Sequence, residues 1–526
     1  MSDKLHVMAE AVREAYARGE EDEALRPLVL ADGEGRAVGR IGHGDPVIFY
    51  DIRGEREVEL TRAFVDPSFQ EFDTAGRLAR FFTMIEYHSE LAAEAAFPPE
   101  VAIKGTMCEA VVGAGRKIVK VVESEKAVHL SYFLNGKRER PFEGERRIVV
   151  ESRKDVNNYD ELPAMSAGEV ADQTIAEMEA GGSDVIIVNF ANVDVVAHIE
   201  NEAAVIQAVQ AVDRELGRVL EAARMAGVTA VVTADHGTAE KWLYPDGKVD
   251  TGHTDSPVPF AIVDEKFQDV RLREGGALTD VAPTVLSLLG IAAPQEMTGS
   301  SLILGAPPGK ARRLLLVICD GWGERDDEHG NLIKKADTPV MDRLRREFPF
   351  TTLAAHGEAV GMPAGKVGNS EAGHLHIGAG RRVLSDRIRI DQAISAGSLA
   401  RNPAFIRAMD ISVNERRPLH LLGIVSFYSS HGSVDHLYAI LRMARDRGVT
   451  ELYHHGLLGR RGERPEAGAR YIDDVETFCE KLGLGRVVTV MGRFWALDRE
   501  NNWDRVEKAY RALADGQGVG VVDSSQ

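Results

Sequence analysis

The chain has 526 residues, more than a single hydrophobic core normally serves, so we expect more than one domain. Hydrophobic residues make up 44% of it and charged residues 28%, proportions that are typical of globular proteins. Its 63 basic and 82 acidic residues give a net charge of −19, which argues against nucleic acid or an anionic membrane as the main partner.

The N-terminal region is predicted to form a helix. Apolar side chains recur at helical spacing over residues 5–16, without the apolar segment of a signal peptide. No apolar run in the chain approaches the roughly 18 residues that a membrane-spanning helix needs. Cys108, Cys319 and Cys479 lie far apart and form no metal-ligand or redox motif, which fits a reducing compartment. We therefore expect a cytoplasmic protein.

Short apolar segments of strand length alternate with amphipathic segments of helix length along the chain. The expected strands are 46–50, 118–122, 184–190, 230–234, 314–319, 420–426 and 487–491. The clearest helix, 203–227, ends at Gly227, a residue type that commonly follows the last helical turn. This alternation predicts an α/β fold with mostly parallel sheets.

The segment 297–313 is rich in Gly, Pro and Ser and precedes the expected strand 314–319. It has two interpretations: a linker that joins two formerly separate chain ends, or an ordinary surface loop. Composition by itself does not decide between them.

Three expected strands run into acidic or histidine residues. Asp320 follows one, Asp194 and His198 follow a second, and Asp235 and His236 follow a third. Because the carboxyl ends of parallel strands meet at one edge of a sheet, these side chains could hold a divalent metal ion such as Mn or Zn. Asp194 and His198 would share a helical face. The alternative is that each Asp only caps a helix or forms a turn.

Ser370 stands before Glu371 and a glycine-rich stretch, a pattern that is typical of a helix N-terminus. Ser370 is either a structural cap or a nucleophile that accepts a phosphoryl group. In the second case, the helix dipole and the free N–H groups at the helix N-terminus would stabilise the incoming phosphoryl oxygens. A metal ion bonded to the hydroxyl would lower its pKa.

Several longer strings together resemble the cofactor-independent phosphoglycerate mutases. Those similar to the N-terminal half of that family are CDGWG (319–323), ADTPVMD (336–342), GNSEAGHLHIGAGR (368–381) and MGRFWALDRENNWDR (491–505). Those similar to its C-terminal half are ESEKAVHLSYF (123–133), NFANVDVVAH (189–198), TADHGTAE (233–240), HTDSPVPF (253–260) and EMTGSSLI (296–303). The two halves stand in reversed order, which resembles a circular permutation joined at about 304–312.

The resemblance implies an alkaline-phosphatase-like, doubly wound α/β domain at 97–384. A second α/β domain, which closes over the substrate, would comprise 385–526 plus 1–96. The resemblance also implies two divalent metal ions, Mn or alternatively Mg, Co or Zn. One ion would be held by Asp194, His198 and His253, and the other by Asp320, Ser370, Asp235 and His236. Ser370 would be the nucleophile.

The family's substrate-binding positions are also matched. They are Arg53, Arg56, Glu125, Lys126, His431, Arg460, Arg493 and Arg499. Guanidinium groups suit phosphate and carboxylate because they bind two oxygens at once. Three departures fall in the substrate-closing domain: Arg461 stands where the family carries Asp, SFYSSHGS (426–433) replaces SDGGVHSH, and Asp51 replaces the Asn of NFR.

The resemblance implies a monomeric isomerase that interconverts 3-phosphoglycerate and 2-phosphoglycerate through a phosphoserine. Because Arg461 adds a cation where a carboxylate is expected, two alternatives stay open. One is a phosphatase or phosphotransferase that acts on another small phosphorylated acid. The other is a non-catalytic protein that keeps the metal site.

Overall fold

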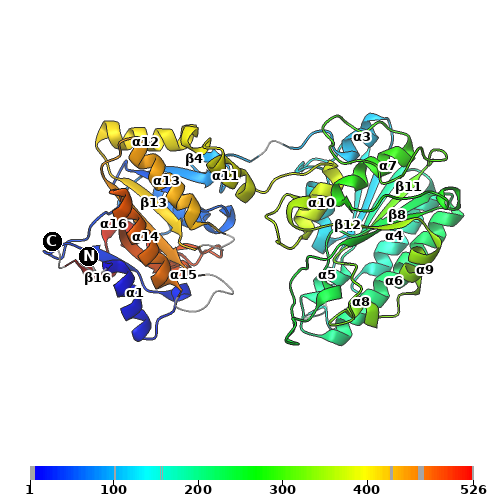
Figure 1. Ribbon diagram of the computed structural model, residues 1–526, viewed down its shortest axis with the longest axis horizontal. Helices are drawn as coiled ribbons and strands as arrows, with labels where there is room; N and C mark the ends of the chain where they lie inside the picture. Colours follow the sequence, from blue (N-terminus) through cyan, green and yellow to red (C-terminus); the bar gives the residue numbers. More distant parts are fainter. Residues whose placement is uncertain are drawn as a thin grey trace. The chain divides into compact units, whose positions relative to one another are not determined.

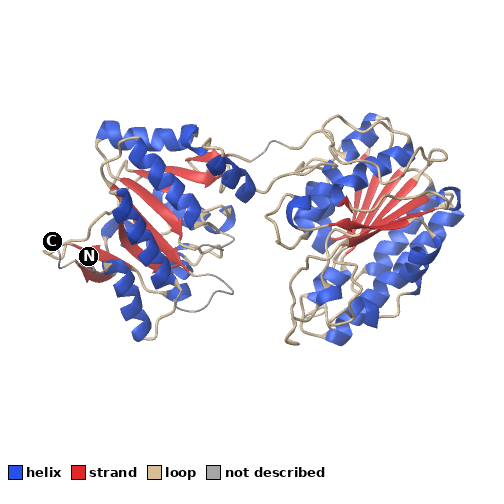
Figure 2. Ribbon diagram, viewed as in Figure 1, coloured by secondary structure: helices blue, strands red, loops and turns tan. Residues whose placement is uncertain are grey.

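The computed structural model describes residues 6–99, 102–153, 156, 158–426, 431–459 and 467–523. The chain divides into two compact units: unit 1 comprises Met1–Pro99 and Asp386–Gln526, and unit 2 comprises Glu100–Ser385. Each unit contains one eight-stranded sheet with helices packed against it (Figures 1 and 2). The α/β fold class predicted from the sequence is therefore confirmed.

The unit 1 sheet is parallel except where β1 meets β15. In spatial order its strands are β16 (Val519–Val522), β1 (Leu28–Ala31), β15 (Arg486–Gly492), β14 (Leu452–Leu458), β13 (Leu419–Ile424), β2 (Pro46–Phe49), β3 (Arg80–Ile85) and β4 (Ala93–Phe97). Strands from the N-terminal and C-terminal parts of the chain are thus hydrogen-bonded neighbours in one sheet, so neither part can form this unit without the other.

Helices cover both faces of the unit 1 sheet, and two apolar clusters result. One cluster includes α1 (Val7–Ala17), α11 (Asp386–Ser395), α12 (Pro403–Glu415), α13 (Val434–Asp446) and α14 (Gly468–Leu482). The other includes α2 (Val58–Val65), α15 (Arg493–Ala496) and α16 (Trp503–Asp515). The expected N-terminal helix is confirmed as α1, whose apolar stripe is buried.

The unit 2 sheet is parallel except that β9 runs antiparallel to both of its neighbours. In spatial order its strands are β10 (Gly276–Ala277), β12 (Phe350–Ala354), β9 (Val258–Val263), β8 (Thr229–Thr233), β11 (Leu314–Cys319), β7 (Val185–Phe190), β5 (Ile118–Glu123) and β6 (Glu145–Val150). Every residue of β11 is buried, as its continuous apolar sequence predicts for a central strand.

The helices of unit 2 vary from a single turn to the long α6. They are α3 (Met107–Gly113), α4 (Ala167–Ala180), α5 (Asn192–Ala197), α6 (Glu202–Met225), α7 (Val281–Leu289), α8 (Leu332–Lys335), α9 (Pro339–Glu347) and α10 (Ser370–Ala379). α6 ends before Gly227, which has the expected positive φ of 61°. Segment 304–312 has no helix or strand and leads into β11. Among the described residues, none of the helices combines the length and apolarity needed to span a membrane.

Candidate metal centre

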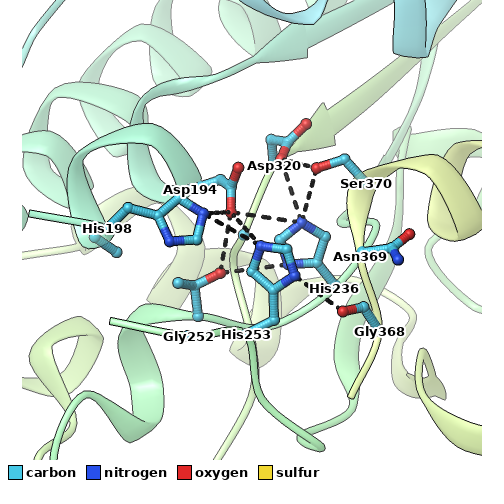
Figure 3. Close-up of polar contacts among 12 residues, drawn as sticks. Asp194, His198, His236, Gly252, His253, Asp320, Gly368, Asn369 and Ser370 are labelled. Atoms are coloured by element: carbon cyan, nitrogen blue, oxygen red, sulfur yellow. Dashed lines mark hydrogen bonds and ion pairs between the residues drawn. The ribbon is translucent and has the colours of Figure 1, made fainter. Parts of the chain in front are cut away.

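Acidic and histidine side chains gather at one edge of the unit 2 sheet, around the N-terminus of α10 (Figure 3). β7, β11 and β8 are parallel neighbours, so their carboxyl ends lie along the same edge. Asp320 follows β11 directly, Asp194 lies in α5 after β7, and Asp235 lies just beyond β8. Strand order therefore brings together three carboxylates that are far apart in sequence.

Asp194, His198 and His253 form the first group of candidate metal ligands. One donor atom of each lies within 4.8 Å of the other two. The Nε2 atoms of His253 and His198 lie 3.2 Å and 3.4 Å from Asp194 Oδ1. Asp194 lies in α5 and His198 at its C-terminal end, so the i,i+4 spacing places both side chains on one face, as predicted.

Three histidines of the centre are oriented by backbone carbonyl groups. The Nδ1-to-oxygen distances are 2.6 Å from His198 to Thr251, 3.0 Å from His253 to Gly368 and 3.2 Å from His236 to Gly237. A carbonyl oxygen can only accept, so each Nδ1 carries a proton, and each Nε2 is left to bind a second proton or a metal ion. All three Nε2 atoms lie among the carboxylates, as metal-binding imidazoles do.

Ser370 lies within a second group of candidate ligands. Its Oγ donates a hydrogen bond to Asp320 Oδ1 at 3.3 Å and lies 3.0 Å from His236 Nε2. Asp194, His236 and Asp320 also bring donor atoms within 4.8 Å of one another. Asp235 Oδ2 is buried and accepts no hydrogen bond from the described residues, and His374 Nδ1 lies 3.2 Å from it, so this oxygen is open to a cation. These residues fit a divalent metal ion.

Lys126 extends its ammonium group into the middle of the centre. Its Nζ lies 2.7 Å from Asp194 Oδ2, from Asp320 Oδ1 and from Ser370 Oγ. Burial opposes the charged amine, but the carboxylates, led by Asp320, outweigh burial and raise the pKa of Lys126. Lys126 is therefore charged, and it offsets part of the negative charge of the centre.

The carboxylates also act strongly on His236. Burial lowers its pKa, but Asp235 and Asp194 outweigh burial and raise the pKa of His236 to about 10. In turn, burial raises the pKa of Asp320, but Lys126 and His236 hold it below its usual range. The centre therefore attracts positive charge, either as protons or as metal ions.

The start of α10 is fixed by local hydrogen bonding and close packing. The Asn369 side chain caps the helix by accepting from the Ala372 N–H at 2.8 Å, and Ser370 is the first helical residue. A Cβ added to Gly373 would lie 2.5 Å from the Asp235 carbonyl oxygen. Only glycine therefore lets this helical turn approach the end of β8, where Ser370 Oγ lies 3.0 Å from His236 Nε2.

Three further residues support the ligands, and the sequence analysis missed them. Asn189 Nδ2 donates to Asp320 Oδ2 at 2.8 Å and lies 3.0 Å from His374 Nε2. Thr238 Oγ1 donates to Asp194 Oδ1 at 3.4 Å. Asn189 could have been found as the one polar residue within an otherwise apolar strand, and His374 as the residue one turn after Ser370.

Three of the predicted substrate-binding arginines in unit 1 have carboxylate partners in the structure. Arg53 Nη2 and Arg499 Nη1 lie 2.8 Å and 3.0 Å from Glu55 Oε1. Arg493 Nε lies 2.8 Å from Glu23 Oε1. One acidic residue thus bridges two of these arginines.

Arg56 and His431 lie in the same electrostatic environment. Arg56 Nη1 donates to the Leu497 carbonyl oxygen at 3.2 Å, and burial together with the neighbouring arginines lowers its pKa. Burial, followed by the charges of Arg493, Arg53 and Arg56, lowers the pKa of His431 to about 4. His431 Nδ1 lies 2.9 Å from Glu57 Oε1. The described part of unit 1 therefore brings four of the predicted arginines together and places the uncharged imidazole of His431 near them.

Glu125 lies beside Lys126 in a short 3-10 helix, Ser124–Lys126, and accepts a hydrogen bond from the Tyr159 hydroxyl at 2.8 Å. Arg460 and Arg461 lie outside the described residues, as do residues 427–430 of the altered segment. The three cysteines are buried and free of disulfide bonds.

Comparisons with known families agree with this arrangement. A family model for the N-terminus of BPG-independent PGAM matches residues 1–89 and 390–525. A model of the Metalloenzyme superfamily matches residues 58–293. A 2,3-bisphosphoglycerate-independent phosphoglycerate mutase from Moorella thermoacetica is 43% identical over 298 residues, which cover 56% of this chain and 57% of the relative. Over about half of its length, the chain is similar to the BPG-independent phosphoglycerate mutases.

A second phosphoglycerate mutase of this kind, from Pseudomonas aeruginosa strain UCBPP-PA14, is 42% identical over 296 residues, or 56% of each chain. The chain thus spans about half the length of the curated mutases it matches. A solved structure, described as Leishmania mexicana phosphoglycerate mutase at low cobalt concentration, is 29% identical, with a TM-score of 0.38, and covers 52% of this chain and 53% of that chain.

Proposed function

We propose that this protein interconverts 3-phosphoglycerate and 2-phosphoglycerate through a phosphoserine at Ser370. The observation that carries the proposal is the position of the Ser370 hydroxyl. It lies at the N-terminus of α10, beside Lys126, Asp320 and His236, within a group of candidate metal ligands. The names of the related proteins supply the substrate class.

In the first step, Ser370 Oγ bonds to phosphorus as the bond from phosphorus to one glycerate oxygen breaks. The serine hydroxyl loses its proton and the released glycerate hydroxyl gains one, so the step is balanced. The second step transfers the phosphoryl group to the adjacent glycerate hydroxyl and regenerates Ser370. Lys126 Nζ, 2.7 Å from Oγ, stabilises negative charge on the serine oxygen and on the transferring group.

We propose that two divalent ions occupy the centre, Mn or alternatively Mg, Co or Zn. The ligands of one are Asp194, His198 and His253, and those of the other are Asp320, Ser370, Asp235 and His236. Bound there, the ions would lower the pKa of the serine hydroxyl and neutralise phosphoryl charge. The lone pairs that the three histidines direct into the centre support this assignment.

The substrate's anionic groups would be bound by cationic side chains and by one uncharged imidazole. Those proposed for this role are Arg53, Arg56, His431, Arg460, Arg493, Arg499 and Lys126, with Glu125 beside Lys126. The mutual electrostatic influence of the unit 1 arginines supports an anion-binding role, because clustered guanidinium groups repel one another unless an anion joins them. A monomeric state and a cytoplasmic location remain predictions from the sequence.

We further propose that the chain is circularly permuted with respect to its relatives, with 304–312 as the joining segment. Two findings support this. The model of the family's N-terminal region matches both ends of the chain. The continuous match to a curated mutase covers only 56% of the chain, although motifs of the family also occur outside the matched part.

Phosphorus NMR tests the proposed reaction. Purified protein is incubated with Mn²⁺ and 3-phosphoglycerate, and the organic and inorganic phosphate signals are followed. A growing 2-phosphoglycerate signal at constant organic phosphate is the expected result. Unchanged substrate in the presence of bound metal would contradict the proposal.

One observation favours a second candidate, a phosphatase or phosphotransferase for another phosphorylated acid. The metal-centre positions match the family throughout, whereas the departures, among them Arg461 and Asp51, lie in the part proposed to close over substrate. If closure is incomplete, water would cleave the phosphoserine. Inorganic phosphate released at the rate of substrate loss would identify this activity.

A further inference from the structure

Unit 1 contains a separate buried cluster of two carboxylates and an imidazole. Asp51 follows β2, Glu57 precedes α2, and His431 lies shortly before α13. Their exposed fractions are 0%, 0% and 2%. One carboxylate oxygen from each acid and one ring nitrogen of His431 all lie within 4.8 Å of one another.

The hydrogen bonding of the two acids leaves an oxygen unsatisfied. Asp51 Oδ1 accepts from the Ile424 N–H at 2.8 Å, whereas Asp51 Oδ2 is buried with no donor among the described residues. Glu57 accepts from the Arg56 N–H at 3.1 Å, and its Oε1 lies 2.9 Å from His431 Nδ1. A fully buried carboxylate oxygen without a donor costs free energy unless a proton or a cation reaches it.

The neighbouring arginine side chains do not satisfy that oxygen. Arg53 bonds to Glu55, and Arg493 bonds to Glu23, both at 2.8 Å. The Arg56 side chain donates to a backbone carbonyl oxygen instead. Within the described parts of the chain, no arginine or lysine side chain therefore bonds directly to Asp51 or Glu57. His431 is their one side-chain partner there that could carry a positive charge, and it does so only when it is protonated.

Burial disfavours the charged forms of all three groups. Burial, and then the proximity of Glu57, raises the pKa of Asp51 well above its usual range. Burial raises the pKa of Glu57 to about 8. The pKa of His431 is lowered to about 4 by burial and the arginines, so its imidazole is neutral at pH 7, as a metal ligand must be.

We propose that Asp51, Glu57 and His431 form a divalent-cation site in unit 1, distinct from the centre around Ser370. Two carboxylate oxygens and one imidazole nitrogen suit Mn²⁺, Zn²⁺ or Fe²⁺. The ion would take the place of the proton that the acid pair otherwise holds. It would also join the end of β2, the start of α2 and the segment before α13. The site needs no phosphoryl transfer, so it goes beyond the function proposed above.

Metal stoichiometry in the full chain tests this site. Chelator-treated protein is equilibrated with Mn²⁺ at pH 7.5, and bound metal is measured by equilibrium dialysis and elemental analysis. Asp51→Asn and Glu57→Gln should each bind one equivalent less than the wild type. Glu55→Gln, which changes a half-exposed neighbouring acid, is the matched control and should bind as much as the wild type.

A background without the other centre separates the two proposals. Asp194→Asn with Asp320→Asn removes a ligand from each of the two ions proposed near Ser370, and this variant should still bind one Mn²⁺ that Glu57→Gln then abolishes. The bound ion should show nitrogen coupling from His431 in pulsed electron paramagnetic resonance. Circular dichroism verifies that each variant folds. Wild-type stoichiometry in both folded Asp51→Asn and Glu57→Gln would overturn the proposal, because the acids would then share a proton only.

Discussion

The ammonium nitrogen of Lys126 lies 2.7 Å from the hydroxyl oxygen of Ser370. The same nitrogen contacts two of the centre's carboxylates, so it occupies the position where positive charge is most strongly stabilised. A phosphoryl group transferred to Ser370 would meet this cation directly. Lys126 would therefore both stabilise the carboxylates of the metal-free centre and stabilise the transferred phosphoryl group.

Replacing Lys126 should destabilise the metal-free protein. Lys126→Met leaves Asp194 and Asp320 buried without their cation, which typically costs about 3–5 kcal/mol. Denaturant unfolding with and without Mn²⁺ measures the effect, and Mn²⁺ should restore much of the lost free energy of unfolding. Lys241→Met, which removes an exposed ion pair with Asp255, is the control. Equal losses in the two variants would contradict the assigned role.

Ser370→Ala should abolish phosphoryl transfer without unfolding unit 2. The substitution removes one oxygen, and the cap of α10 comes from Asn369 rather than from Ser370. Loss of a nucleophile typically lowers kcat by about 10⁴-fold or more. Phosphorus NMR gives the rate, and mass spectrometry of substrate-treated protein should find phosphate on Ser370 in the wild type. Turnover by the variant would mean that another group accepts the phosphoryl.

Gly373→Ala should displace α10 from the end of β8. The added methyl group would lie 2.5 Å from the Asp235 carbonyl oxygen, and such overpacking typically costs about 1–3 kcal/mol. We expect weaker Mn²⁺ binding and lower turnover as well as a lower melting temperature. Gly168→Ala is the matched control, because that helical glycine in α4 has open space around it and alanine favours helix. Unaltered Mn²⁺ affinity in Gly373→Ala would contradict this account.

Unit 1 should lose stability as the pH falls below about 6.5. His454 and His455 in β14 are fully buried, and burial lowers their pKa values, to about 3 for His454. The unfolded chain takes up these protons below its pKa of about 6.5, whereas the folded chain does not until lower pH. Between the two pKa values, each such histidine therefore lowers the free energy of unfolding by about 1.4 kcal/mol for each unit that the pH falls.

Hydrogen exchange of unit 1 amides at pH 7 and pH 5 measures this dependence. His454→Gln removes the titrating group and retains an atom that can bond to the Tyr50 hydroxyl, 3.1 Å from His454 Nε2. We expect a flatter pH profile in this variant. His329→Gln, at an exposed loop of unit 2, should leave the profile of unit 1 unchanged. An identical slope in His454→Gln and the wild type would refute the prediction.

Local sequence was sufficient to predict several of the strands and two of the helices. Apolar runs located β11, β7 and β8, and the 3.6-residue period together with Gly227 located α6. The acidic residues that follow the strands were found for the same reason, since parallel strands present their carboxyl ends at one edge. These inferences depend on near neighbours in the chain, which side-chain period and backbone preference control.

Tertiary structure decided what the side chains contact. Asn189 and His374 support Asp320 and Asp235 across segments that are distant in sequence, and only the order β8–β11–β7 brings them close. Burial of Asp51 beside Glu57 likewise depends on packing within unit 1, because nothing local excludes water from an acidic residue after a strand. Charge, desolvation and hydrogen bonding act through space and not along the chain. The sequence therefore identified the candidate residues, and the folded structure determined which of them act on one another.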